Sequence, residues 1–314
     1  MARTIRYQQP SAFWAKTFPF KVQKVSLDTG FTCPNRDGTK GYGGCTYCNN
    51  DSFNPSYCGP DKSISTQLHE GIAFFARKYS KMKYLAYFQA YTNSYSDDET
   101  VINYYQQAID HPDIVGLVVG TRPDCVSDRV LDFLEESARH RFTSLEFGVE
   151  STLDRTLEII NRCHTFDETR QAYARAANRG IHLGAHMILG LPGESIEDLI
   201  AHADRLNELP IQSVKLHHLQ IIRRTIMAKQ FADNPDFIIH FTPESYADMV
   251  VSFLERLRPD IIVERFIAQA PPDLLIAPQW GGVRNYEMVS IIEKKLEERD
   301  TCQGRLHQNI LQTS

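Results

Sequence analysis

The sequence predicts an α/β protein built on a parallel sheet. Strand-like and helix-like segments alternate from about Lys21 to Leu219, with six apolar strands separated by amphipathic helices. Polar or glycine-rich turns follow the strands, as a shared site at one edge of a sheet requires. Such alternation gives right-handed crossovers and either a doubly wound sheet or a TIM-like barrel. Periodicity does not choose between these two folds.

Composition agrees with one large α/β barrel or two ordinary domains, because 314 residues with 42% hydrophobic content can fill a substantial core. The formal net charge of −5 excludes a global basic field but leaves a local basic patch open. No apolar run approaches the roughly 20 residues that span a bilayer, and residues 1–20 lack an apolar signal-peptide core. We therefore expect no membrane association and a cytoplasmic location.

In the first half of the chain, residues 1–20 mix aromatic residues with prolines and are expected to form an irregular arm. The alternating segment Lys21–Leu27 then predicts the first strand. Further strands are expected at Tyr84–Phe88, Ile114–Val119 and Ser144–Phe147, and helices at Ser63–Tyr79, Glu99–Ile109 and Asp128–His140.

In the second half, a helical stretch is expected to break around Arg162–Phe166. Strands are expected at Ile181–Leu189, Ser213–Leu219 and Ile261–Ile267, and helices at Ile196–Asn207, Glu244–Leu257 and Glu287–Glu298. Thr242 is a suitable N-cap and Pro243 a suitable first residue for the helix that follows them. Beyond about Ile226 the alternation loosens without a flexible linker, so this part is expected to pack on the preceding fold.

Three of the seven cysteines, Cys33, Cys45 and Cys48, lie in one glycine-rich loop with the spacing C-x11-C-x2-C. Clustered thiols in a chain without an export signal indicate a metal centre before a disulfide. Structural zinc closes its tetrahedron with four ligands, for which Cys58 is a candidate fourth. An iron–sulfur cube held by three cysteines instead leaves one iron open for chemistry.

The loop sequence, CPNRDGTKGYGGCTYC, resembles the cluster loop of the radical S-adenosylmethionine (SAM) enzymes. The long first spacing is similar to that of the Elongator catalytic subunit and the YhcC/YtqA-like proteins, and departs from the more widespread C-x3-C-x2-C. The resemblance implies that Cys33, Cys45 and Cys48 bind a [4Fe-4S] cluster whose fourth iron is chelated by SAM. It also implies that an electron donor such as flavodoxin or ferredoxin reduces the cluster, which splits SAM into methionine and a 5′-deoxyadenosyl radical.

The same resemblance favours a barrel over a doubly wound sheet. It implies a partial (β/α)6 TIM-like barrel with a C-terminal α/β extension, and an active site at the C-terminal ends of the strands. The expected parts are an N-terminal arm at 1–20, the radical SAM partial barrel at 21–226, and the extension at 227–314.

Two strand-end turns resemble the Elongator-like branch. Gln-Ala-Tyr-Thr-Asn at 89–93 is similar to its QA-x-TN segment beside the methionyl amino group of SAM, and Thr-Arg-Pro-Asp at 121–124 is similar to its TRPD turn. The residues expected to contact SAM from these turns are Gln89, Thr92, Asn93, Thr121 and Arg122. Arg122 and Asp124 are expected to pair, either to orient carboxylate or nucleotide oxygens or as a structural salt bridge.

The next two turns complete the expected SAM site. The segment at 148–151 resembles the fourth-strand segment that holds the ribose hydroxyls, which implies Glu150 first and Ser151 second. The turn at 190–194 resembles the fifth-strand segment behind the adenine, which implies Gly190, Leu191 and Pro192.

Three polar residues alternate on the sixth strand. Lys215 and His217 are expected on one face and His218 on the other, so one set faces the cavity. Lone histidines are more often structural than ligands. Cys125, directly after the TRPD turn, is expected to be a packed thiol.

Relatives of the Elongator branch act on wobble uridines of tRNA, so the resemblance favours radical modification of a tRNA base. A local basic patch of Arg223, Arg224 and Lys229 is expected to bind the tRNA phosphates. One alternative is a radical reaction on a small molecule or tetrapyrrole, as in the related oxygen-independent coproporphyrinogen oxidases. Another is a non-catalytic zinc-binding protein that retains the barrel.

Overall fold

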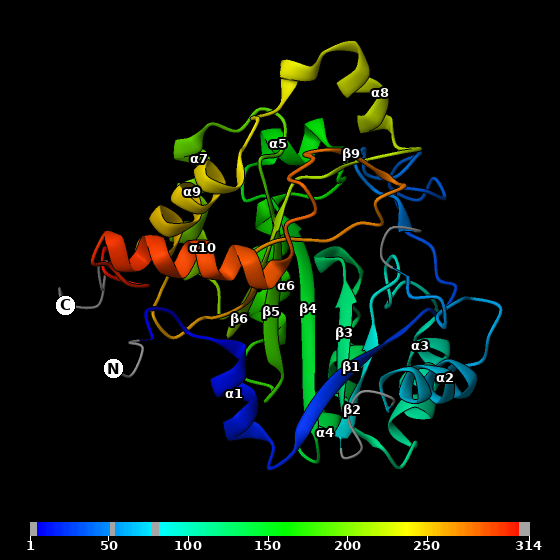
Figure 1. The fold of residues 1–314 in the computed structure, drawn as a ribbon. Coiled ribbons are helices and arrows are strands. Elements are labelled where there is room, and N and C mark those ends of the chain that lie inside the picture. Colours follow the sequence, from blue (N-terminus) through cyan, green and yellow to red (C-terminus); the bar gives the residue numbers. More distant parts are fainter. Residues whose placement is uncertain (1–4, 51–53, 77–81, 308–314) are drawn as a thin grey trace.

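The computed structural model describes residues 5–50, 54–76 and 82–307 (Figure 1). Its main sheet has seven strands, all paired in parallel, in the order β1-β2-β3-β4-β5-β6-β8. The strands are β1 (Lys21–Leu27), β2 (Met82–Phe88), β3 (Ile114–Thr121), β4 (Phe142–Glu150), β5 (His182–Leu189), β6 (Ser213–His218) and β8 (Ile262–Arg265).

The strand order confirms the partial barrel. Each strand lies beside the one before it and the order never reverses, whereas a doubly wound sheet reverses at its switch point. β1 and β8 occupy the two edges of the sheet, so the barrel is open. The strand expected in the C-terminal extension therefore adds a seventh strand beside β6, where Ile262 N–H donates to the Gln212 carbonyl at 2.9 Å.

Helices surround the curled sheet (Figure 1). They are α1 (Pro10–Thr17), α2 (Ile64–Ala76), α3 (Asp98–Ile109), α4 (Asp128–Ala138), α5 (Asp154–Ile159), α6 (Phe166–Ala176), α7 (Ile196–Asn207), α8 (Ile226–Asp233), α9 (Pro243–Arg256) and α10 (Asn285–Glu298), with 3-10 turns at Pro123–Cys125 and Pro235–Phe237. Residues 77–79 of the expected first helix lie outside the described residues. In the described ranges, no helix combines the length and apolarity that crossing a membrane demands.

The expectation of an irregular N-terminal arm is wrong for Pro10–Thr17, which form α1. Pro10 occupies the start of the helix, where its missing N–H costs nothing. The rings of Phe13 and Trp14 contact Phe142, at the start of β4, with centroids 6.0 and 5.2 Å apart. These contacts, distant in sequence, place α1 across the N-terminal ends of the strands, and a local pattern does not reveal them.

The C-terminal part surrounds the other end of the barrel. β7 (Ile221–Ile222) and β9 (Leu275–Ala277) form a short antiparallel ribbon, which leads on to α8. Neither the ribbon nor α8 was expected from the pattern. α9 packs against α7 and α10 and begins as predicted, because Thr242 Oγ1 accepts the Ser245 N–H at 3.1 Å.

Candidate functional site

A cavity of about 180 Å³ opens at the C-terminal ends of the strands. We call the wall formed by the cysteine loop and the strand ends the rim. The predicted residues in the rim are Cys33, Cys45, Cys48, Gln89, Thr92, Thr121, Arg122 and Glu150, joined by Arg36 and Arg162. We call the wall formed inside the barrel the inner end. It comprises Tyr87, Glu146, His186, His217 and Arg265.

The remaining predicted residues are not among those that line this cavity. They are Asn93, Ser151, Gly190, Leu191 and Pro192. Asn93 is fully buried and donates from Nδ2 to the Gly120 carbonyl at 2.8 Å, which ties the turn after β2 to β3. Ser151 donates to Glu194 Oε1 at 2.6 Å. Both side chains therefore make structural contacts in this arrangement.

The glycine turn after β5 also lies apart from the cysteines. Gly190 lines a second, smaller cavity of about 50 Å³ together with Trp280. Leu191 is buried in a separate apolar cluster that includes Ile188 and Met227. The assignment of this turn to the adenine stays a prediction.

A guanidinium group lies beside each cysteine of the loop. The contacts are Arg122 Nη1 to Cys33 Sγ at 3.9 Å, Arg162 Nη1 to Cys45 Sγ at 3.6 Å, and Arg36 Nη2 to the Cys48 carbonyl at 3.3 Å. Burial raises the pKa of the Cys48 thiol to about 11, against the opposing charge of Arg36. Positive charge beside the loop suits the negative charge that three thiolate ligands would carry.

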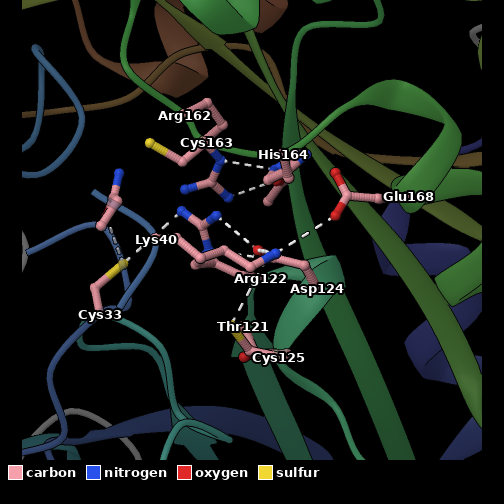
Figure 2. Close-up of polar contacts among 12 residues, drawn as sticks. Cys33, Lys40, Thr121, Arg122, Asp124, Cys125, Arg162, Cys163, His164 and Glu168 are labelled. Atoms are coloured by element: carbon pink, nitrogen blue, oxygen red, sulfur yellow. Dashed lines mark hydrogen bonds and ion pairs between the residues drawn. The ribbon is translucent and has the colours of Figure 1, made fainter. Parts of the chain in front are cut away.

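Arg122 also forms the predicted pair with Asp124. Its Nε and Nη2 donate to the two carboxylate oxygens, both at 2.9 Å, and Lys40 Nζ reaches the same carboxylate at 2.7 Å. Burial alone would raise the pKa of Asp124, but the bonds and charge of Arg122 hold it well below its usual range. Figure 2 shows Arg122 between Asp124 and Cys33, so the pair fixes a guanidinium that also faces a thiol.

Glu150 is held at the rim by a strained backbone and by Arg162. Its φ of +65° lies in the left-handed region, and the β4–β5 register shifts between Gly148 and Glu150. Arg162 Nη2 lies 3.5 Å from Glu150 Oε1 and donates to the Gly148 carbonyl at 2.6 Å. Burial raises the pKa of Glu150 in spite of Arg162. Strain of this kind concentrates at functional sites.

Thr92 contributes a buried hydroxyl to the rim that is suited to hydrogen-bond a ligand. Thr92 is buried at the rim, and its Oγ1 has no hydrogen-bond partner among the described residues. A buried polar atom without a partner costs about 1–3 kcal/mol, so such atoms usually meet a ligand or water. Its neighbour Gln89 donates from Nε2 to Ser26 Oγ at 2.9 Å.

Sequence reasoning missed most of the inner end. Glu146, whose side chain is 1% exposed, bonds to Lys24 at 3.0 Å, to His186 at 2.9 Å and to Lys215. Lys215 and His217 face the barrel interior as the alternation predicts, whereas His218 stacks on Trp280 with centroids 4.3 Å apart. The sequence signal that could have identified the inner end is the presence of charged residues within otherwise apolar strands.

The cysteine loop suits an iron–sulfur cube better than a zinc ion. In the ranges that the structure describes, no three His, Cys, Asp or Glu side chains converge on one ion. Cys33, Cys45 and Cys48 line the cavity as a set of three, the number that leaves one iron of a cube open. The proposed fourth zinc ligand, Cys58, bonds to Gln67 Oε1 at 3.4 Å and does not line the cavity. Cys125 also lies off the lining, with its pKa raised to about 12 by burial.

Family comparisons agree with this geometry. Residues 32–206 match the family described as the Radical SAM superfamily, and residues 211–298 match the Radical_SAM C-terminal domain. The uncharacterized protein YtqA of Bacillus subtilis is 33% identical over 98% of this chain and 95% of its own length. Protein YhcC of Escherichia coli is 40% identical over 86% of each chain.

More distant similarity reaches the Elongator branch. The tRNA uridine(34) acetyltransferase of Methanocaldococcus infernus is 23% identical over 59% of this chain and 34% of its own length. The solved structure of Elp3 from the same organism superposes with a TM-score of 0.67 at 15% identity, covering 90% of this chain and 64% of that one. That superposition shows a shared fold.

Proposed function

We propose that this chain, which belongs to the radical SAM superfamily and to its YhcC/YtqA-like group, modifies a uridine base of tRNA. It is an enzyme, and members of the superfamily use a [4Fe-4S] cluster and SAM. When bound, these cofactors supply a carbon-centred radical that takes a hydrogen atom from the substrate. Radical SAM enzymes need a reductant, for which flavodoxin or ferredoxin is our candidate.

The observation that carries the cofactor assignment is the rim itself. Three thiols, each beside a guanidinium, share one cavity with the unpartnered hydroxyl of Thr92. In our assignment Cys33, Cys45 and Cys48 hold the cluster. Thr92 and Gln89 hydrogen-bond the methionyl end of SAM, and Glu150 accepts from the ribose hydroxyls.

A basic surface next to the cysteine loop supports tRNA as the substrate. Arg223 and Arg224 are exposed between β7 and α8, and Lys229 is exposed on α8. Backbone bonds tie this segment to the loop, since Met227 N–H donates to the Thr46 carbonyl at 2.8 Å. Exposed cations beside the cysteine loop suit the phosphates that flank a flipped-out base. The name of the distant archaeal relative, a tRNA uridine(34) acetyltransferase, points the same way.

The test is tRNA binding and turnover by the cluster-loaded protein. Binding is expected to weaken as salt rises, because counterion release dominates electrostatic affinity. Arg224→Glu should weaken it at low salt, with cluster content as the check on folding. Arg139→Glu makes the same charge change at the C-cap of α4, at the opposite end of the strands, and should leave binding intact.

Mass spectrometry of nucleosides from cells that lack the protein identifies the modified base. If tRNA neither binds at low salt nor raises 5′-deoxyadenosine release, and nucleosides from the deletion cells are unchanged, the tRNA assignment fails. A radical reaction on a small molecule or tetrapyrrole then takes its place.

A further inference from the structure

Arg265 stands at the inner end of the cavity without an acidic partner. Its Nε and Nη2 both donate to Nε2 of His217, at 3.1 and 2.6 Å. Within the described ranges no carboxylate lies within ion-pairing distance of its guanidinium, because the nearby acids pair elsewhere. Two of its five N–H donors are thus used, both by one neutral acceptor.

The neighbouring acids are fully engaged by lysines. Glu146 pairs with Lys24 and Lys215, and Glu264 pairs with the same two lysines at 2.9 and 3.8 Å. Burial opposes ionisation of both acids, but the charges of the two lysines have the larger combined effect. They hold the pKa of Glu146 well below its usual range and that of Glu264 at about 2. Two lysines and two carboxylates therefore cancel, and the charge of Arg265 is in excess.

The histidines of the inner end do not change this balance. Burial lowers the pKa of His186 to about 4, and burial with the charge of Arg265 lowers that of His217 well below its usual range. Both imidazoles are neutral near pH 7 and add no charge. Leaving a guanidinium in a low-dielectric site without a counter-ion is costly, so the excess positive charge calls for an anion from outside the chain.

The position of Arg265 separates it from the cofactor end. The guanidinium groups beside the cysteines come from the segments after β1, β3 and α5, whereas Arg265 lies on β8, at one edge of the sheet. Arg265 pairs in register with Lys215 on β6, and Lys215 pairs with His186 on β5. His186 in turn pairs with Gly148 on β4. Gly148 precedes Glu150 by two residues, so this level lies inside the barrel below the rim.

We propose that Arg265 and His217 bind a carboxylate of the substrate. A carboxylate carries one negative charge, which matches the single excess positive charge, and it is planar, which suits the guanidinium fork. A phosphate monoester carries nearly two charges near neutral pH and would overcompensate. The inference rests on the proposed function only in placing the reaction in this cavity, and it holds for a nucleoside side chain or a free small molecule.

The first test adds small anions to the cluster-loaded protein before SAM, and the Arg265 variants distinguish this site from the one that takes the SAM carboxylate. At pH 8, acetate and formate at millimolar concentration should raise the unfolding midpoint of the wild type above matched chloride, and inorganic phosphate, which is then mostly the dianion, should not. Arg265→Lys should keep part of this response and Arg265→Gln should lose it, at least tenfold in apparent affinity. Arg139→Gln, on the far side of α4, should behave as wild type.

The second test separates a ligand site from a structural one. Arg265→Gln removes an uncompensated charge, so the protein without cofactors should be as stable as wild type or more stable. A marked loss of stability would mean that Arg265 serves the fold, and an unchanged carboxylate response in Arg265→Gln, or a response to phosphate alone, would also overturn the inference.

The two proposals fail separately. If Arg265→Gln binds and modifies tRNA with the wild-type KM, the carboxylate site is wrong while tRNA remains the substrate. If small carboxylates bind through Arg265 and tRNA does not bind at all, the carboxylate site stands and the tRNA assignment fails.

Discussion

Arginine is used differently at the two ends of the cavity. At the rim, Arg122 meets Asp124 through two bonds of 2.9 Å, and Arg162 meets Glu150 and a backbone carbonyl. At the inner end, the hydrogen-bond partner of Arg265 among the described residues is the neutral ring of His217. The rim guanidiniums are thus anchored before any ligand arrives, whereas the inner one has its charge free to interact with an incoming group.

This difference indicates that the rim arginines support the cofactor site, whereas Arg265 recognises a substrate. An anchored cation keeps its position when the thiolates and iron arrive, which suits a cofactor that stays in place. An unmatched cation stabilises the protein only when a ligand is bound, which suits a substrate that comes and goes. The four predictions that follow test this contrast, from the largest expected effect to the smallest.

Loss of a rim cysteine should abolish the cluster. The reconstituted wild type should bind about four irons and absorb broadly near 400 nm, because three thiolates hold three corners of the cube. Cys33→Ala or Cys45→Ala should lose both signals. Cys58→Ala should keep them, since its thiol bonds to Gln67 outside the cavity. Stoichiometric zinc without iron uptake would contradict the assignment.

Removing a rim arginine should destabilise the fold far more than removing the inner one. Arg162→Gln leaves the buried carboxylate of Glu150 without its cation, which costs about 3–5 kcal/mol of unfolding free energy. Arg265→Gln should cost nothing. Urea unfolding of the two variants without cofactors makes the comparison directly, and equal losses would erase the distinction between the two ends.

Glu150→Ala should weaken SAM binding by about 1–3 kcal/mol, because the ribose hydrogen bonds are lost. Equilibrium binding of SAM to the cluster-loaded protein measures it. Ser151→Ala is the matched comparison, since its hydroxyl donates to Glu194 away from the cavity and SAM affinity should persist. Unchanged affinity in Glu150→Ala would remove the ribose role and leave the cluster assignment intact.

The smallest effect is a pH dependence from the inner end. Burial lowers the pKa of His186 to about 4 in the folded protein, against about 6.5 when unfolded. Above pH 6.5 its full contribution is present, and as pH falls the unfolded chain takes up a proton that the folded chain refuses. Stability should therefore drop by about 1 kcal/mol from this residue between pH 6.5 and 5.5.

His186→Gln checks the source of this drop, because the amide keeps a donor for Glu146 and does not titrate. Its unfolding free energy should depend less on pH than that of the wild type, measured in urea at both pH values. If the unfolding free energy of both proteins changed equally with pH, the imidazole of His186 would already be charged. The neutral count of charges around Arg265 would then be wrong.

The strands and the rim were largely predictable because their signals are local. Alternation located β1, and the spacing of Cys33, Cys45 and Cys48 located the loop. The site residues that the sequence did not predict depend on tertiary contacts. Arg162 lies in a break between two helices, and Arg265 lies on a strand that the pattern assigned to an extension rather than to the sheet. Gly190 followed a strand end as expected, yet faces a different cavity.

The aromatic residues beneath the barrel close the cavity at its inner end. Helix α1 lies at the lower end of the strands (Figure 1), and its Trp14 packs with Phe142 in the cluster that also holds Tyr87, a residue of the inner end. Ligands that enter and leave through the rim do so in a fixed order, because the group bound deepest enters first and leaves last. A substrate group seated at Arg265 must enter before SAM fills the rim, so steady-state kinetics should show substrate binding ahead of SAM and leaving after it.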